Sequence, residues 1–235
     1  MKTAAVIVAA GSGSRMKAPV PKPFLELIER PLLRWSLQPF QASQLVDEIV
    51  IVVGEPDVDR AKALITFRDI NKVTAVVAGG ATRQESVQNG MARLSPEVEI
   101  VLIHDGARPF VTPAIIASVI EGVLEKGAAV PVIAINDTIK QVNAAGLIEK
   151  TIDRHALRAA QTPQGFRVAL IRDAHAEAVE NDFCGTDDAC LVERLGHTIV
   201  PVEGSTENIK ITTPDDMIRA ESIAQRRLRE AATTL

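Results

Sequence analysis

The sequence has few cysteines, no excess of positive charge and no long apolar run. Its two cysteines, Cys184 and Cys190, are too few for a disulfide framework and belong to no metal-binding motif, so we expect reduced, structural thiols. A formal net charge of −4 provides no overall basic field, which argues against binding to nucleic acid or to an anionic membrane. No apolar stretch approaches the ~20 residues that span a bilayer, so we expect a cytoplasmic protein without membrane contact.

Short runs rich in valine and isoleucine recur along the chain and alternate with amphipathic stretches. Continuous rather than alternating hydrophobicity is typical of strands that are covered on both faces. Such a βαβ series predicts one α/β domain over residues 1–235, with a doubly wound, mainly parallel sheet that binds ligands beyond the carboxyl ends of its strands. The predicted strands cover residues 4–9, 49–53, 73–78, 100–103, 128–135 and 198–202.

Helix start and stop signals fall between these runs. Thr112 and Thr213 each place a capping hydroxyl before a proline of the first helical turn. Gly127 and Gly196 can end helices, because glycine adopts the left-handed conformation that often closes a helix.

One segment interrupts the alternation of strands and helices. Residues 138–142 and 147–152 are two extended pieces around a turn-prone Asn-Ala-Ala-Gly sequence, which predicts a β-hairpin arm within residues 137–154. A lone hairpin is only marginally stable in water, so an arm that projects from an α/β body would gain stability by packing on another subunit. We therefore expect a homodimer that forms through the arm.

A glycine-rich loop follows the first predicted strand, in the sequence Ala-Ala-Gly-Ser-Gly-Ser-Arg-Met at residues 9–16. Glycine lets a backbone approach a phosphate closely, and free N–H groups in such a loop bind anions. The loop is neither a Walker phosphate loop, since Gly-Lys-Ser/Thr is absent, nor a dinucleotide fingerprint, since Met16 stands where a glycine is needed. Arg15 and Lys22 place two cations beside it, suited to neutralising a triphosphate. The alternative is a tight strand-to-helix turn with solvated basic residues.

The loop and the segments after it resemble, in order and spacing, the 2-C-methyl-D-erythritol 4-phosphate cytidylyltransferase family of sugar nucleotidyltransferases. The matching segments are residues 9–16 with Pro21-Lys22, Gly79-Gly80 with Arg83 and Ser86, His-Asp-Gly-Ala-Arg-Pro at 104–109, Asp137-Thr138, Thr-Ile-Asp-Arg at 151–154, Thr-Pro-Gln at 162–164, Thr-Asp-Asp-Ala at 186–189 and Asn-Ile-Lys at 208–210. The resemblance spans roughly residues 4 to 220 and implies a Rossmann-like nucleotidyltransferase fold.

The resemblance also implies a reaction in the non-mevalonate isoprenoid pathway. CTP and 2-C-methyl-D-erythritol 4-phosphate would give 4-diphosphocytidyl-2-C-methyl-D-erythritol and pyrophosphate, with Mg²⁺ as the cofactor. The attacking phosphate monoester is already anionic at neutral pH, so the reaction needs no strong general base. The enzyme's task is positioning and charge neutralisation, which suits a site rich in cations.

By the same resemblance, three sets of residues would form the site. Arg15, Lys22 and Lys210 would be the catalytic cations. Ala9, Ala10, Gly11, Gly13, Gly79, Gly80, Arg83 and Ser86 would bind the nucleotide. Asp105, Thr138, Arg154, Thr162 and Lys210 would bind the acceptor, and Thr138 and Arg154, which flank the arm, would reach the partner's active site.

Asp105 and Glu207 are the residues that the resemblance points to for Mg²⁺. Asp105 directly follows a predicted strand, at the ligand edge of the sheet, and hard cations prefer carboxylate oxygen. It could instead cap its own loop. Glu207, next to the Asn-Ile-Lys segment, would be a second acid near the metal.

Five further residues have structural explanations. Arg83 and Arg108 can each brace a loop by pairing with a carboxylate. His104 is better explained as a structural hydrogen-bonding residue, because the reaction needs no base. Asp187 and Asp188 follow Thr186 at a predicted helix start, where capping explains them.

Two other functions compete with the one that the resemblance implies. A cytidylyltransferase that acts on ribitol 5-phosphate would have a similar phosphate loop and Asn-Ile-Lys segment. A nucleotide-binding protein with an inactive site is the alternative from another class, but pure binding would not require Arg15, Lys22 and Asp105 together.

Overall fold

A parallel sheet forms the centre of the molecule. The computed structural model describes residues 1–11, 13–16, 18–65 and 70–233. Strand β1 pairs in parallel with β4 on one side and β6 on the other, and β4 pairs in parallel with β5. The bounds are β1 Lys2–Ala9, β4 Glu48–Val53, β5 Val73–Ala78 and β6 Val98–Asp105. All four predicted strands in this half are confirmed.

The other half of the eight-stranded sheet is mixed. Strand β7 (Ala128–Ala134) is parallel to β12 (Val200–Glu203), and both were predicted. Strand β11 (Gln164–Arg167) lies antiparallel between β6 and β7, and β10 (Arg158–Ala160) is antiparallel to β7. These two antiparallel strands were not predicted, because their short and partly polar sequences contain no apolar run.

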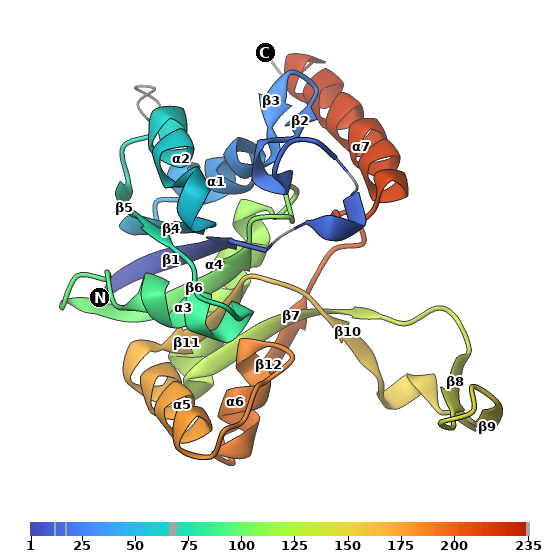
Figure 1. The fold of residues 1–235 in the computed structure, drawn as a ribbon. Coiled ribbons are helices and arrows are strands. Elements are labelled where there is room, and N and C mark those ends of the chain that lie inside the picture. The colour runs from blue at the N-terminus through green and yellow to red at the C-terminus, as the bar shows by residue number, and fades with distance from the viewer. Residues whose placement is uncertain (12, 17, 66–69, 234–235) are drawn as a thin grey trace.

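Helices cover both faces of the sheet, so the doubly wound prediction is confirmed (Figure 1). Alternate residues of β1 belong to two different apolar clusters: Ala5 and Ile7 pack with one layer of helices, and Ala4 and Val6 pack with the other. Helices α1 (Leu32–Ala42), α2 (Val58–Ile65) and α4 (Pro113–Lys126) form the first layer, and α3 (Arg83–Met91), α5 (Val168–Glu180) and α6 (Asp188–Arg194) form the second.

The C-terminal helix α7 (Pro214–Thr233) packs with a small antiparallel pair, β2 (Glu26–Leu27) and β3 (Arg30–Pro31), around a third apolar cluster. No helix in the described part of the chain combines the length and apolar character that crossing a membrane requires.

The predicted helix caps are present. The Thr112 hydroxyl accepts a hydrogen bond from the Ile115 amide at 3.3 Å, and the Thr213 hydroxyl accepts one from the Asp216 amide at 3.4 Å. Gly127 ends α4 in the left-handed conformation, with φ of 88°. Gly196, with φ of 74°, follows the end of α6.

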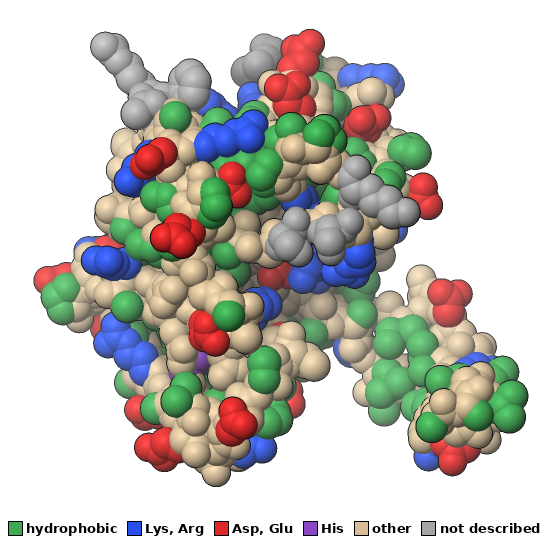
Figure 2. All heavy atoms as spheres, in the orientation of Figure 1, with side chains coloured by type: hydrophobic (Ala, Val, Ile, Leu, Met, Phe, Trp, Pro, Cys, Tyr) green, Lys and Arg blue, Asp and Glu red, His purple; other side chains and the backbone are tan. Residues whose placement is uncertain are grey.

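The hairpin arm forms where it was predicted. Strands β8 (Ile139–Val142) and β9 (Ile148–Ile152) pair only with each other among the described strands and project from the body (Figure 1). The Asn143 side chain accepts hydrogen bonds from the Ala145 and Leu147 amides and so closes the turn. Figure 2 shows the arm as a separate lobe with apolar side chains on its surface.

Candidate nucleotide-binding site

A cavity of about 370 Å³ opens beyond the carboxyl ends of β1 and β6. This is the edge at which doubly wound sheets bind their ligands. The predicted site residues that line it are Ala9, Ala10, Gly11, Lys22, Gly80, Arg83, Ser86, Asp105 and Lys210. Gly13 lines a neighbouring hollow of about 380 Å³ that shares Ala9, Ala10, Gly11 and Lys22 with the cavity. The structure thus gathers residues from both ends of the chain at one edge of the sheet.

Close approach between backbone segments explains two glycines around the cavity. A Cβ atom on Gly106 would lie 2.9 Å from the Ala9 Cβ, and a Cβ on Gly79 would lie 2.7 Å from the Ser86 hydroxyl oxygen. Both distances are shorter than van der Waals contact allows, so these positions require glycine. Gly79 packs against Ala10 and Ser86 and is not among the residues that line the cavity.

The turn before α3 is held by its own hydrogen bonds. The buried Ser86 hydroxyl donates to the Thr82 carbonyl at 2.8 Å and accepts from the Gly80 amide at 3.1 Å. Glu85 accepts a hydrogen bond from the Ala81 amide, and the Thr82 hydroxyl caps α3. Ser86 thus fixes the cavity wall, and its contact with a nucleotide stays a prediction.

Asp105 is the anionic centre of the cavity. Its carboxylate lies 2.8 Å from the Lys210 Nζ, 3.4 Å from the Arg83 Nε and 3.7 Å from the Arg108 Nε. Burial alone would raise the pKa of Asp105, but the charges of Lys210, Arg83 and Arg108 outweigh burial and hold the pKa well below its ordinary value. The side chain is therefore an anion at neutral pH.

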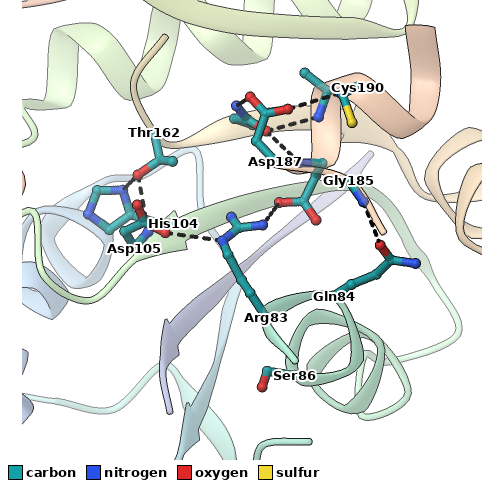
Figure 3. Close-up of polar contacts among 12 residues, drawn as sticks. Arg83, Gln84, Ser86, His104, Asp105, Thr162, Gly185, Asp187 and Cys190 are labelled. Atoms are coloured by element: carbon teal, nitrogen blue, oxygen red, sulfur yellow. Dashed lines mark hydrogen bonds and ion pairs between the residues drawn. The ribbon is translucent and has the colours of Figure 1, made fainter. Parts of the chain in front are cut away.

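His104 and Thr162 hold Asp105 in place (Figure 3). The fully buried His104 ring contacts the Arg108 carbonyl and the Thr162 hydroxyl, each at 3.0 Å, and the same hydroxyl accepts a hydrogen bond from the Asp105 amide at 3.0 Å. Burial lowers the pKa of His104 to about 4. The structural role predicted for His104 is confirmed. Thr162 is also buried, so the structure gives it a positioning role, and its predicted contact with substrate stays untested.

Two lysines flank Asp105. Lys22, in a 3-10 turn (Lys22–Phe24), donates to the Ile211 carbonyl at 3.3 Å. Burial lowers the pKa of Lys22, and the nearby charges of Lys210 and Arg15 lower it further. Arg15 is exposed and lies outside the cavity lining. The charges of Arg15 and Lys210 thus both act on Lys22, and Lys22 and Lys210 line the cavity.

Glu207 does not lie where a second metal ligand was expected. Its carboxylate pairs with Arg226, and with Arg227 at 3.0 Å, both on α7, and it is not among the residues that line the cavity. Glu207 therefore belongs to an ion-pair cluster with α7, outside the cavity lining that contains Asp105, and its predicted role as a second metal ligand stays untested. Among the described residues, no group of three or more His, Cys, Asp or Glu could hold a metal ion.

The predicted structural roles of Arg83, Arg108 and Asp187 are confirmed, and that of Asp188 is wrong. Arg108 donates to the Asn208 carbonyl at 2.7 Å, and Arg83 pairs with both Asp105 and Asp188. Asp187 caps α6 by accepting a hydrogen bond from the Cys190 amide. Capping does not explain Asp188, whose side chain is 1% exposed and pairs with Arg83 instead.

Asn208 has a structural role that was not predicted. Its side-chain amide donates to the Thr162 carbonyl at 2.9 Å, and its own backbone carbonyl accepts from Arg108. It therefore ties the segment that carries Lys210 to the loop that carries Asp105. Its place beside Ile209 and Lys210 in a matching motif was the available signal.

The predicted acceptor-binding residues of the arm lie away from this chain's cavity. Thr138 and Arg154 are exposed at the base of the arm, and neither lines the cavity. Arg154 donates to the Asn136 carbonyl and so braces the two sides of the base.

Comparison with known proteins gives the family. The model of the IspD family, 2-C-methyl-D-erythritol 4-phosphate cytidylyltransferase, matches residues 3–226. The chain belongs to this family. It is 44% identical over 230 residues to the 2-C-methyl-D-erythritol 4-phosphate cytidylyltransferase of Geobacillus kaustophilus (strain HTA426), covering 98% of this chain and 100% of that relative. It also matches the bifunctional enzyme IspD/IspF of Rhodopseudomonas palustris (strain BisB5) at 47% identity over 227 residues, covering 94% of this chain and 55% of the relative.

Solved structures of the family have the same fold. The 4-diphosphocytidyl-2C-methyl-D-erythritol synthase of Anaerococcus prevotii matches with a TM-score of 0.85 at 31% identity, covering 95% of this chain and 96% of that chain. The 2-C-methyl-D-erythritol 4-phosphate cytidylyltransferase of Thermus thermophilus matches with a TM-score of 0.78 at 36% identity, covering 94% of this chain and 98% of that chain. The mixed, mainly parallel sheet is thus the fold of the family.

Proposed function

We propose that the protein transfers the cytidylyl group of CTP to 2-C-methyl-D-erythritol 4-phosphate and releases pyrophosphate, in isoprenoid biosynthesis. The observation that carries this proposal is the Lys210–Asp105 ion pair, with Lys22 in the same cavity lining beside the glycine-rich loop, in a chain of this family. Arg15, Lys22 and Asp105 argue against an inactive nucleotide-binding protein, because binding alone would not require them together.

The chemistry needs positioning and positive charge. An oxygen of the acceptor phosphate attacks the α-phosphorus of CTP, a new P–O bond forms, and the bond from the α-phosphorus to the oxygen that bridges to the β-phosphate breaks. Pyrophosphate leaves with the electron pair of that bond. Lys22 and Lys210 neutralise the negative charge that develops on the phosphate oxygens, and Arg15 adds a third positive charge.

Asp105 would hold Mg²⁺, which neutralises the triphosphate. The cavity fits this role, because Mg²⁺ is usually bound through one or two carboxylates together with substrate phosphates. Asp105 is the one ionised carboxylate among the described residues that line the cavity. Lys210, which pairs with Asp105 at 2.8 Å, would then turn to the phosphates.

We further propose that the enzyme is a homodimer in which the arm of one subunit completes the site of the other. The exposed fractions of Leu147 and Ile148 are 65% and 67%, so the tip of the arm presents an apolar surface. Burying such a surface against a second subunit would stabilise the hairpin. Thr138 and Arg154, which do not line the cavity of their own chain, would then bind the acceptor at the partner's cavity.

We place the reaction in the cytoplasm. Both cysteines are free thiols in the structure, and free thiols suit a reducing compartment.

Pyrophosphate release by the purified protein tests the proposal. With Mg²⁺ and CTP, we expect release with methylerythritol 4-phosphate and none with ribitol 5-phosphate or without acceptor, and ATP, GTP and UTP should not replace CTP. Release with ribitol 5-phosphate would assign the other acceptor. Silence of the folded protein under every condition, with CTP still bound, would favour the nucleotide-binding alternative.

A further inference from the structure

Arg83 is shared between a carboxylate in the cavity and a carboxylate behind it. Its Nη1 lies 2.7 Å from the Asp188 Oδ2, whereas its Nε lies 3.4 Å from the Asp105 Oδ1. The Arg83 side chain is 30% exposed, and the Asp188 side chain is 1% exposed. The Arg83–Asp188 pair is therefore the shorter and better buried of the two, and Asp188 is not among the residues that line the cavity. Figure 3 shows Arg83 reaching from α3 toward Asp105, with a second dashed contact on its other side.

Asp188 is a fixed anchor for Arg83. The Gln164 side-chain oxygen accepts hydrogen bonds from the Asp188 and Ala189 amides, each at 3.1 Å, and the Gln164 amide donates to Asp187 at 2.7 Å. The His175 Nε2 lies 3.5 Å from the Asp188 Oδ1 on the remaining side. Because the start of α6 is tied to the central strand β11, the Asp188 carboxylate cannot follow Arg83 toward the cavity.

The position of Arg83 affects how many positive charges surround Asp105. Three cations face the Asp105 carboxylate, namely Lys210, Arg83 and Arg108. Each of them competes with a divalent cation for the same oxygens. Asp188 neutralises the charge of Arg83 and holds its guanidinium close, at 2.7 Å. The contact between Arg83 and the Asp105 Oδ1 is therefore long, at 3.4 Å.

We propose that Asp188 is a positioning residue for the nucleotidyl-transfer site: by holding Arg83 off Asp105, it leaves the Asp105 carboxylate available to a divalent cation bound with the nucleotide. This proposal rests on the cytidylyltransferase function proposed above. It assigns a role in the reaction to a buried aspartate that helix capping leaves unexplained.

The substitution Asp188→Asn tests the proposal through two readouts of opposite sign. Without the Asp188 charge, Arg83 turns to Asp105, and the cavity gains one positive charge. We expect the Mg²⁺ concentration for half-maximal turnover to rise about tenfold, while calorimetry in EDTA shows CTP binding at least as tightly as to the unchanged protein. A merely structural loss would weaken CTP binding in EDTA as well, and that outcome would overturn the proposal.

Two further variants complete the test. Glu48→Gln is the matched control, because Glu48 is also 1% exposed and paired with a cation, Lys2 at 3.0 Å, but lies at the opposite end of the sheet. It should lower the melting temperature without moving either readout. In an Arg83→Gln background, Asp188→Asn should no longer change the Mg²⁺ dependence, and a persisting tenfold change would also overturn the proposal.

The test separates this proposal from the proposed function. If the unchanged protein binds CTP but shows no turnover with methylerythritol 4-phosphate, the proposed function fails. Calorimetric titration of CTP with Mg²⁺ and in EDTA then still compares the variants: a loss of the Mg²⁺-dependent gain in affinity in Asp188→Asn supports the role of Asp188, and an unchanged gain contradicts it.

Discussion

At the residue scale, burial and neighbouring charges shift the pKa values of the ionisable residues in the site. Lys22 and Asp105 have pKa values below their ordinary ranges for different reasons: burial disfavours the lysine cation, while neighbouring cations favour the aspartate anion. The two residues therefore differ in what a substitution removes. In the proposed reaction, loss of Lys22 would remove a charge that acts on the substrate, whereas loss of Asp105 removes the group that balances three cations.

Lys22→Ala should lower turnover by about 10²- to 10³-fold while the fold remains intact, because a cation that stabilises transition-state charge is typically worth this much. Steady-state pyrophosphate release measures the loss, and circular dichroism checks the fold. Lys62→Ala is the control, since Lys62 lies exposed on α2 and pairs with Asp59, three residues before it. Near-normal turnover in Lys22→Ala would remove Lys22 from the catalytic machinery.

His104 should make the stability of the protein depend on pH. Its pKa is about 4 in the folded protein and about 6.5 when unfolded, so between these values the unfolded chain binds a proton that the folded protein excludes. Stability should therefore be full above pH ~6.5 and should fall by roughly 3 kcal/mol as the pH drops to ~4. Urea unfolding at pH 7 and pH 5 of the unchanged protein and of His104→Asn measures it. Equal pH dependence in both proteins would contradict this account.

At the scale of single elements, the hydrophobic pattern of the sequence does not predict the antiparallel strand β11. Its four residues, Gln-Gly-Phe-Arg, lie between β6 and β7 and pack beneath α4. The strand brings Gln164 to the start of α6 and Thr162 to the amide of Asp105. Strand β11 and the residues just before it thus position Asp105 and the start of α6.

Gly165→Ala should destabilise the protein by about 1–3 kcal/mol, the usual cost of overpacking a core. The added Cβ would lie 2.5 Å from the Val119 Cγ1 and 2.9 Å from the Val123 Cγ2 of α4, and valine side chains have little rotamer freedom to move away. Urea unfolding measures the change. Gly11→Ala is the control, because a Cβ there meets nothing within 4 Å, and an equal loss in both variants would argue against the clash.

At the scale of the whole molecule, the arm has no partner in its own chain among the described elements, since β8 and β9 pair only with each other. A compact body and a projecting apolar hairpin suit a subunit that is completed by a second copy. The predicted acceptor residues Thr138 and Arg154 stand at the base of this arm, so assembly and substrate binding would be linked.

If the arm forms the proposed dimer, the double substitution Leu147→Asp and Ile148→Asp should give a monomer and raise the KM for the acceptor, because it places charges on the surface that the proposed partner would bury. Light scattering coupled to size-exclusion chromatography measures the mass. Val179→Asp is the control, since Val179 is 62% exposed on α5 in the body. A dimer that survives the double substitution would show that subunits associate elsewhere.

Much of this protein could be predicted from its sequence because the relevant signals are local. Buried parallel strands appear as continuous apolar runs, helix ends appear as Thr-Pro pairs and glycines, and the loop at residues 9–16 places its glycines and Arg15 within a few positions of one another. The motifs that identify the family are equally short. These features determined the fold class, the arm, the family and the cavity-lining residues from Ala9 to Lys22.

The tertiary structure alone decided how distant segments meet. That β11 enters the sheet between β6 and β7, that Asp188 anchors Arg83 and that Glu207 faces two arginines of α7 all depend on contacts between residues far apart in the chain. The sequence around a carboxylate does not reveal which cation it will pair with, because ion pairing depends on distance and burial in the folded protein. For this reason the sequence by itself determined which residues could form the site, and only the fold determined which of them face the cavity.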